Sequence, residues 1–77
     1  MSQHLPAVGA RQVIAALRRA GFIVDRIVGS HYILARPDDP ARAVTVPFHG
    51  VRDIKPGTLR SIIRQAGLTV EAFRDLL

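Results

Sequence analysis

One histidine in this chain follows a glycine in a setting that suits proton transfer. The segment Gly29-Ser30-His31 opens a hydrophobic run rich in β-branched residues, in a chain with 11 Lys and Arg against 6 Asp and Glu. Glycine allows a sharp backbone turn or the close approach of a substrate, and free imidazole titrates at about pH 6.5. The pattern indicates acid–base chemistry by His31 on a polyanion, with Gly29 and Ser30 as supporting or substrate-positioning residues.

The charge and residue types of the chain indicate which classes of partner it binds. The formal net charge is +5, carried almost entirely by arginine, which favours planar, bidentate contacts with phosphate. Nucleic acid is therefore the first expected partner, and an acidic protein is the second. The 77 residues contain no cysteine, so we expect one small domain over residues 1–77 without disulfides or thiolate metal sites.

The same composition makes several further classes of protein unexpected. No apolar stretch approaches the roughly 20 residues of a membrane span, and Met1 to Pro6 lacks the features of a signal peptide. We therefore expect a soluble cytoplasmic protein with no membrane partner. No His, Asp and Glu residues cluster at the spacing of metal ligands, so we expect neither a metal nor another cofactor.

A second histidine follows the motif Val44-Thr45-Val46-Pro47. In an antiparallel meander, His49 lies either near His31 or across the sheet from it, and the sequence leaves both arrangements open. His49 is thus a candidate for supporting the chemistry, or else a loop residue that hydrogen-bonds the chain reversal at Gly50. His4 precedes the first predicted element and is given no role.

Four residues are candidates for binding RNA. Lys55 precedes Pro56-Gly57 at the start of a predicted helix, where backbone N–H groups attract anions, although an ordinary solvated lysine fits equally well. Arg60 and Arg64 share one helical face and form either solvated surface charge or an RNA-binding flank. Tyr32 either stacks on an unpaired base or packs against the sheet.

Hydrophobic periodicity predicts six elements. A helix runs from about Gly9 to Ala20, and strands cover residues 22–28, His31–Arg36 and Val44–Val46. A turn over residues 37–40, with two prolines, is expected to close the second strand, and Pro47 to end the third. A second long helix begins near Pro56 and ends at Gly67. Thr69 caps a last short helix, from which Phe73, Leu76 and Leu77 are expected to pack on the core.

This order predicts an α+β fold. An α-β-β-β-α arrangement with short connections forms a three-stranded antiparallel sheet with the helices on one face, because each amphipathic stripe needs a surface to cover. Double-stranded-RNA-binding domains have this layout. Fold alone does not assign function.

The ordered series of motifs resembles the HicA-type toxins of bacterial toxin–antitoxin systems. The series begins with Gly21-Phe22 and Gly29-Ser30-His31 and continues with Val44-Thr45-Val46-Pro47, His49, Lys55-Pro56-Gly57-Thr58-Leu59-Arg60 and Gln65-Ala66-Gly67-Leu68. The resemblance implies a double-stranded-RNA-binding-domain-like fold, cleavage of mRNA with His31 as the catalytic histidine, and neutralisation by a HicB-type antitoxin. Members of the family often have a second histidine at the position of Tyr32, so a paired-histidine mechanism is not expected here.

The sequence therefore predicts a metal-independent endoribonuclease toxin with His31 as its acid–base group. RNA carries its own nucleophile in the 2′-OH, so cleavage needs a base, an acid and cations on the phosphate. The rival interpretation is a non-catalytic RNA-binding module or an inactive relative of the toxins. A protein-binding adaptor is a third class.

Overall fold

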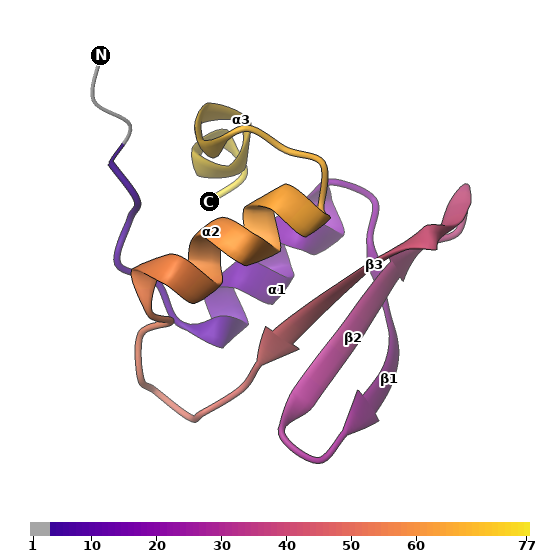
Figure 1. Cartoon of the computed structure of the whole chain (residues 1–77), viewed down its shortest axis with the longest axis horizontal. Coiled ribbons are helices and arrows are strands. Elements are labelled where there is room, and N and C mark those ends of the chain that lie inside the picture. Colours follow the sequence, from indigo (N-terminus) through magenta and orange to yellow (C-terminus); the bar gives the residue numbers. More distant parts are fainter. Residues whose placement is uncertain (1–3) are drawn as a thin grey trace.

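The computed structural model describes residues 4–77; residues 1–3, the start of the segment predicted to lack a signal peptide, lie outside the described part. Helix α1 (Ala10–Arg19) precedes strands β1 (Ile23–Val28), β2 (His31–Arg36) and β3 (Asp39–Pro47), and helices α2 (Pro56–Gln65) and α3 (Val70–Asp75) follow. The strands form one antiparallel sheet in the order β1-β2-β3, and Figure 1 shows α1 and α2 on the same side of it. The predicted α+β class and double-stranded-RNA-binding-domain-like arrangement are confirmed.

Helix α1 follows the expected pattern. The Gly9 N–H donates a 3.0 Å hydrogen bond to the Gln12 side chain, which satisfies a donor at the start of the helix. The helix buries one stripe of small and aliphatic side chains, namely Ala10, Val13, Ala16 and Leu17. Its observed bounds differ from the prediction by one residue at each end.

The sheet has one covered and one uncovered face. Leu34 of β2 pairs with Val44 of β3, and both side chains are fully buried on the side where α1 and α2 pack. Because side chains alternate along a strand, the neighbouring pairs Ile33 with Thr45 and Ala35 with Ala43 lie on the other face. No helix or strand among residues 4–77 covers that face. The uncovered face is therefore available to a partner or substrate.

Strand β1 is the least covered strand. Its partner is β2 alone, and a register irregularity between Val24 and Arg26 bends it. Ile23, Ile27 and Val28 keep about half of their surface exposed, at 51%, 52% and 55%. The helices pack against β3, so β1 projects beyond them (Figure 1).

The third strand is longer than predicted. It begins at Asp39 and includes Pro40, whereas we expected a turn through Pro40 and a strand starting at Val44. The regular pairing with β2 ends at Ala35 with Ala43 and resumes only at Arg36 with Asp39. Pro40 thus lies in an irregular stretch of an edge strand, where no ladder N–H is required of it.

The two C-terminal helices begin as predicted. Pro56 occupies the first turn of α2, and the Thr69 side chain accepts a 3.0 Å hydrogen bond from the Ala72 N–H at the start of α3. Phe73 is fully buried and Leu76 packs against the core. The prediction for Leu77 was wrong, because this last residue is 46% exposed beyond the end of α3.

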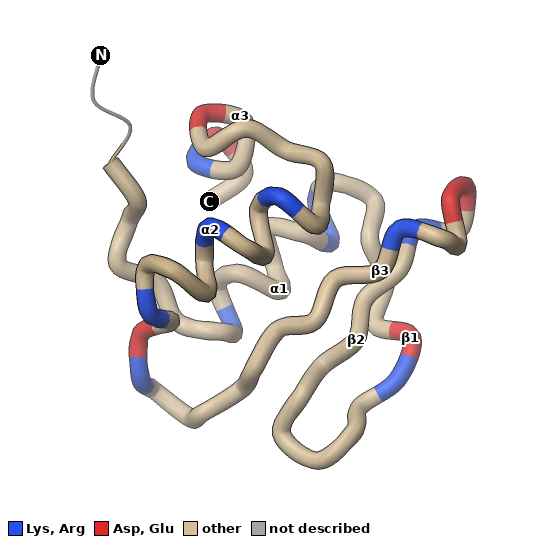
Figure 2. Tube along the Cα trace, viewed as in Figure 1, with Lys and Arg blue, Asp and Glu red and all other residues tan. Residues whose placement is uncertain are grey.

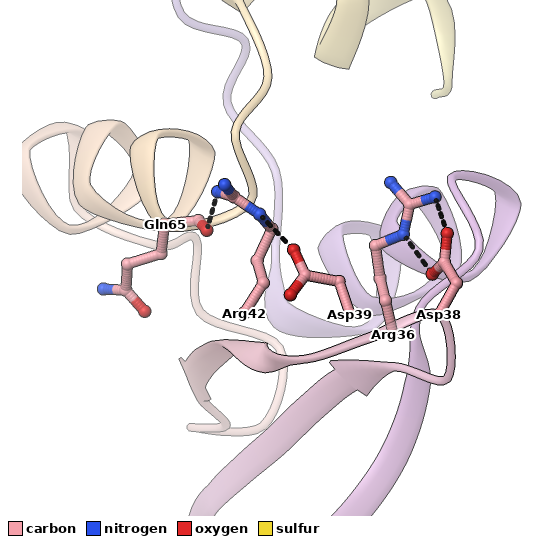
Figure 3. Close-up of polar contacts among 5 residues, drawn as sticks. All are labelled: Arg36, Asp38, Asp39, Arg42 and Gln65. Atoms are coloured by element: carbon pink, nitrogen blue, oxygen red, sulfur yellow. Dashed lines mark hydrogen bonds and ion pairs between the residues drawn. The ribbon is translucent and has the colours of Figure 1, made fainter.

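A clamp joins the end of α2 to β3. Arg42 donates through Nη1 to the Gln65 carbonyl at 3.2 Å and through Nε to Asp39 Oδ2 at 3.4 Å (Figure 3). The Gln65 side chain in turn accepts from the Thr45 N–H at 3.1 Å, which satisfies a donor on the edge of β3. Gly67 has φ +73°, and a Cβ added there would lie 2.7 Å from Arg42 Nη1. The clamp therefore fixes the C-terminal end of α2 against β3.

No helix among the described residues is both long enough and apolar enough to cross a membrane.

Candidate active site

His31 is the first residue of β2 and is exposed. It pairs with Val28 of β1 on one side and with Pro47 of β3 on the other. Counting along β2 from buried Leu34, His31 belongs to the uncovered face of the sheet. Its imidazole is therefore open to a large substrate on a rigid central strand.

The turn before His31 depends on Gly29. Gly29 has φ +59°, a conformation that side chains disfavour, and it forms a two-residue hairpin connection with Ser30. A Cβ added at Gly29 would meet nothing within 4 Å, so the glycine is required by the backbone and the space beside it is open. The Ser30 carbonyl accepts a 2.7 Å hydrogen bond from the Phe48 N–H, which ties the turn to the end of β3.

His49 lies at the same end of the sheet as His31. It is one residue beyond Phe48, whose N–H bonds the residue preceding His31, and it is exposed. The His49 carbonyl accepts a 3.4 Å hydrogen bond from the Arg52 N–H, across the chain reversal that contains Gly50. His49 thus has a backbone role in the loop, and its part in the chemistry stays a prediction.

A pocket of about 340 Å³ lies beside this end of the sheet. Pro47, the β3 partner of His31, and Ile54 supply its apolar surface. Its polar lining consists of His49, Arg52, Asp53, Lys55 and Thr58. Pro47 therefore links the pocket directly to the ladder position of His31.

The loop that forms the pocket is anchored to the chain before α1. The Ile54 N–H donates a 2.8 Å hydrogen bond to the Val8 carbonyl, and Asp53 forms an antiparallel bridge with Gly9. Ile54 and Val8 are both buried. These contacts hold the backbone of residues 53–54 in place between β3 and α2.

The candidate RNA-binding cations fall into two groups. Lys55 is the N-cap residue of α2 and lines the pocket with His49. Arg60 and Arg64 are exposed further along α2, outside the buried stripe of Leu59, Ile62 and Ile63. Figure 2 shows basic positions spaced along α2. The structure brings Lys55 close to the histidine end of the sheet and leaves the two arginines on the helix.

Tyr32 is directed to the opposite face from His31. Its ring stacks on Phe48, with 5.0 Å between ring centroids and an interplanar angle of 28°. It is half-buried and packs against the hydrophobic core. The role predicted for Tyr32 in RNA binding stays a prediction. The stacking on Phe48 gives the same ring a structural role.

Several other arginines make structural contacts. Arg19 Nη1 donates to the Leu76 carbonyl at 2.7 Å, which joins α1 to the end of α3. Arg36 contacts both carboxylate oxygens of Asp38 at 3.0 Å, as Figure 3 shows, and these hydrogen bonds hold the pKa of Asp38 below its usual value. This pair lies in the β2–β3 turn, at the opposite end of β2 from His31.

Sequence reasoning missed Arg52, Asp53 and Thr58 as site residues. The only local signal was the density of polar residues between His49 and Lys55. That signal does not reveal a pocket, because its formation depends on the contacts of Ile54 and Asp53 with residues 8 and 9.

A family model described as HicA toxin of bacterial toxin-antitoxin matches residues 10–68. The match spans every candidate site residue, namely Gly29, Ser30, His31, Tyr32, His49, Lys55, Arg60 and Arg64. No curated protein sequence matches the chain.

Proposed function

This chain belongs to the HicA toxin family of bacterial toxin–antitoxin systems, and we propose that it is an endoribonuclease that cleaves mRNA with His31 as its acid–base group. The observation that carries the proposal is the position of His31, exposed on the uncovered face of the sheet beside a pocket with two cationic side chains. An RNA strand needs such access, whereas a histidine that served only packing would be enclosed.

The proposed reaction uses the nucleophile that RNA supplies. His31 accepts the proton of a ribose 2′-OH as the 2′-oxygen attacks the adjacent phosphorus. The bond from phosphorus to the 5′-oxygen then breaks, and that oxygen takes a proton from an imidazolium or from water. The products are a 2′,3′-cyclic phosphate and a 5′-OH end, so atoms and charges balance without a metal.

The surroundings of His31 support this chemistry. Developing negative charge on the phosphate is stabilised by cations placed in advance, and Lys55 lies on the adjoining pocket. Gly29 and Ser30 position His31 through the turn, and the Ser30 carbonyl is fixed by Phe48. His49 lines the same pocket as Lys55 and is a candidate proton donor. Arg60, Arg64 and Tyr32 are proposed to extend the RNA contact.

A toxin of this family implies an antitoxin partner. We propose a HicB-like, acidic antitoxin that covers His31 and Lys55. The net charge of +5 would attract such a protein electrostatically, and arginines that hold phosphate also pair with carboxylates. Inhibition would then follow from occlusion of the RNA site.

The rival function is a non-catalytic RNA-binding module, and the replacement of the family's frequent second histidine by Tyr32 is the observation in its favour. The test incubates the purified protein with an RNA and with a DNA of the same sequence. A nuclease that uses the 2′-OH shortens the RNA and leaves the DNA intact. An RNA that is retarded in a gel but keeps its length would instead support the binding module and contradict the proposal.

A further inference from the structure

The pocket between β3 and α2 contains Arg52, a cation that the proposed chemistry at His31 does not use, together with Lys55. We propose that this pocket holds one nucleotide of the RNA strand next to the cleaved bond, with its phosphate on Arg52 and Lys55. The inference deepens the proposed function and rests on it, because the nucleotide is assigned as part of the substrate of His31.

The charge of the pocket fits a single phosphodiester. Arg52 and Lys55 each contribute one positive charge and Asp53 one negative charge, which gives these three residues a net charge of about +1. A phosphodiester carries one negative charge. Asp53 repels the anion, so it weakens binding and keeps the site from favouring more highly charged ligands.

The two cations are available for a ligand. Within residues 4–77, the ion pairs are Arg26 with Asp25, Arg36 with Asp38 and Arg42 with Asp39. None of these pairs uses Arg52, Lys55 or Asp53, and all three residues are exposed. Binding a phosphate therefore breaks no internal ion pair of the described chain, in contrast to a phosphate on Arg36 or Arg42.

The pocket is built in advance of binding. The hydrogen bond from the Ile54 N–H to the Val8 carbonyl and the bridge of Asp53 to Gly9 fix residues 53 and 54, which line the pocket. A site that is already ordered loses less conformational entropy when a ligand binds. Its volume of about 340 Å³ lies in the range of small-ligand sites, and Pro47 and Ile54 provide apolar surface for a ribose or base.

The location relates the pocket to the reaction. Pro47 lines the pocket and is also the direct β3 partner of His31, so adjacent strand backbones separate the two features. Opposed residues in an antiparallel pair are only about 5 Å apart between Cα atoms. A nucleotide in the pocket thus adjoins the phosphodiester that His31 would act on, and Arg52, Lys55 and Thr58 are placed to set its position.

The test measures binding of a 2′-O-methyl hexauridylate, which cannot be cleaved through a free 2′-OH, by fluorescence anisotropy across a salt series. The variant Arg52→Ala/Lys55→Ala is compared with Arg18→Ala/Arg74→Ala, which removes the same charge from exposed positions on α1 and α3. We expect the first variant to raise Kd at least about tenfold and to flatten the salt slope by about 0.7, because the pocket holds one phosphate and each phosphate contact on single strands contributes roughly 0.7. The control should change Kd less than about threefold.

A further variant tests the sign of the electrostatics. Asp53→Asn keeps the backbone bridge to Gly9 and removes the repelling charge, so it should tighten binding about twofold or more. Equal losses of affinity in the two double variants, or no binding of the oligonucleotide by the wild-type protein, would overturn the proposal that the pocket binds a nucleotide. The proposal would also be overturned if a polyglutamate peptide bound as tightly as the oligonucleotide, with the same dependence on Arg52 and Lys55. The site would then suit an acidic protein.

The outcomes separate this inference from the proposed function. If RNA binding depends on Arg52 and Lys55 but the protein never shortens RNA, the nucleotide-binding pocket is supported and the proposed nuclease activity is contradicted. If cleavage depends on His31 but its KM is unchanged by Arg52→Ala/Lys55→Ala, the proposed nuclease activity is supported and the nucleotide-binding pocket is contradicted.

Discussion

Replacing Gly67 with alanine should destabilise the protein through two separable effects. The first is the backbone, because φ at Gly67 is +73° and a side chain in this conformation costs about 1–2 kcal/mol. The second is contact with Arg42, whose Nη1 would lie 2.7 Å from the new Cβ. The guanidinium is flexible, so it moves away and gives up its hydrogen bond to the Gln65 carbonyl, which is worth about 1 kcal/mol.

Gly50 provides a matched control. It also has a positive φ, of +66°, but a Cβ there meets nothing within 4 Å. Gly50→Ala should therefore show the backbone cost alone, and Gly67→Ala should exceed it by about 1 kcal/mol. The gain from a stiffer unfolded chain applies to both variants and cancels in this difference.

The assay is urea unfolding followed by circular dichroism, extended to a double-mutant cycle with Arg42→Ala. In the Arg42→Ala background the contact with the guanidinium is gone, so Gly67→Ala should fall to the cost of Gly50→Ala. A coupling free energy near zero between positions 42 and 67 would refute the energetic role of the clamp. Equal losses in the free energy of unfolding for Gly50→Ala and Gly67→Ala would independently refute the energetic role of the clamp.

Three further predictions concern the proposed function. Cleavage should persist in excess EDTA and leave 2′,3′-cyclic phosphate ends, as mass spectrometry of the products would show; activity that EDTA abolishes and a divalent ion restores would contradict the mechanism. Changing Lys55, Arg60 and Arg64 together to alanine should flatten the salt dependence of RNA binding by about 2, at roughly 0.7 per contact, and an unchanged slope would place the RNA on another face. The cognate antitoxin should displace labelled RNA from the His31→Ala protein in a competition titration, and a stable ternary complex would exclude occlusion.

Much of the fold could be predicted because local signals agreed with the final packing. The second strand was bounded correctly at His31 and Arg36, since Gly29-Ser30 and Pro37 provide turn residues at both ends. The sequence predicts a third strand that is shorter than the observed one, because Pro40 indicates a break. Only the pairing of Asp39 with Arg36 shows that the edge strand continues past an irregularity.

The arrangement of the site was less predictable because it depends on distant contacts. His31 was identified from its own motif, but the sequence left the position of His49 open. The hydrogen bond from the Phe48 N–H to the Ser30 carbonyl brings His49 to the same end of the sheet as His31, and this contact depends on the β2–β3 register. Likewise, the stacking of Tyr32 on Phe48 and the place of Arg52 in the pocket depend on contacts between segments that the sequence alone does not bring together.

The most direct test of the central claim is the single-turnover rate of RNA cleavage by His31→Ala, compared with His4→Ala as a control at another exposed histidine. Loss of an acid–base group typically lowers the rate by about 10²–10⁴-fold. Because His31 is exposed, its replacement should change the free energy of unfolding by no more than about 0.5 kcal/mol. The account predicts a folded His31→Ala protein with this loss of rate and a His4→Ala protein that cleaves normally. A folded His31→Ala protein that cleaves RNA at the wild-type rate would contradict it.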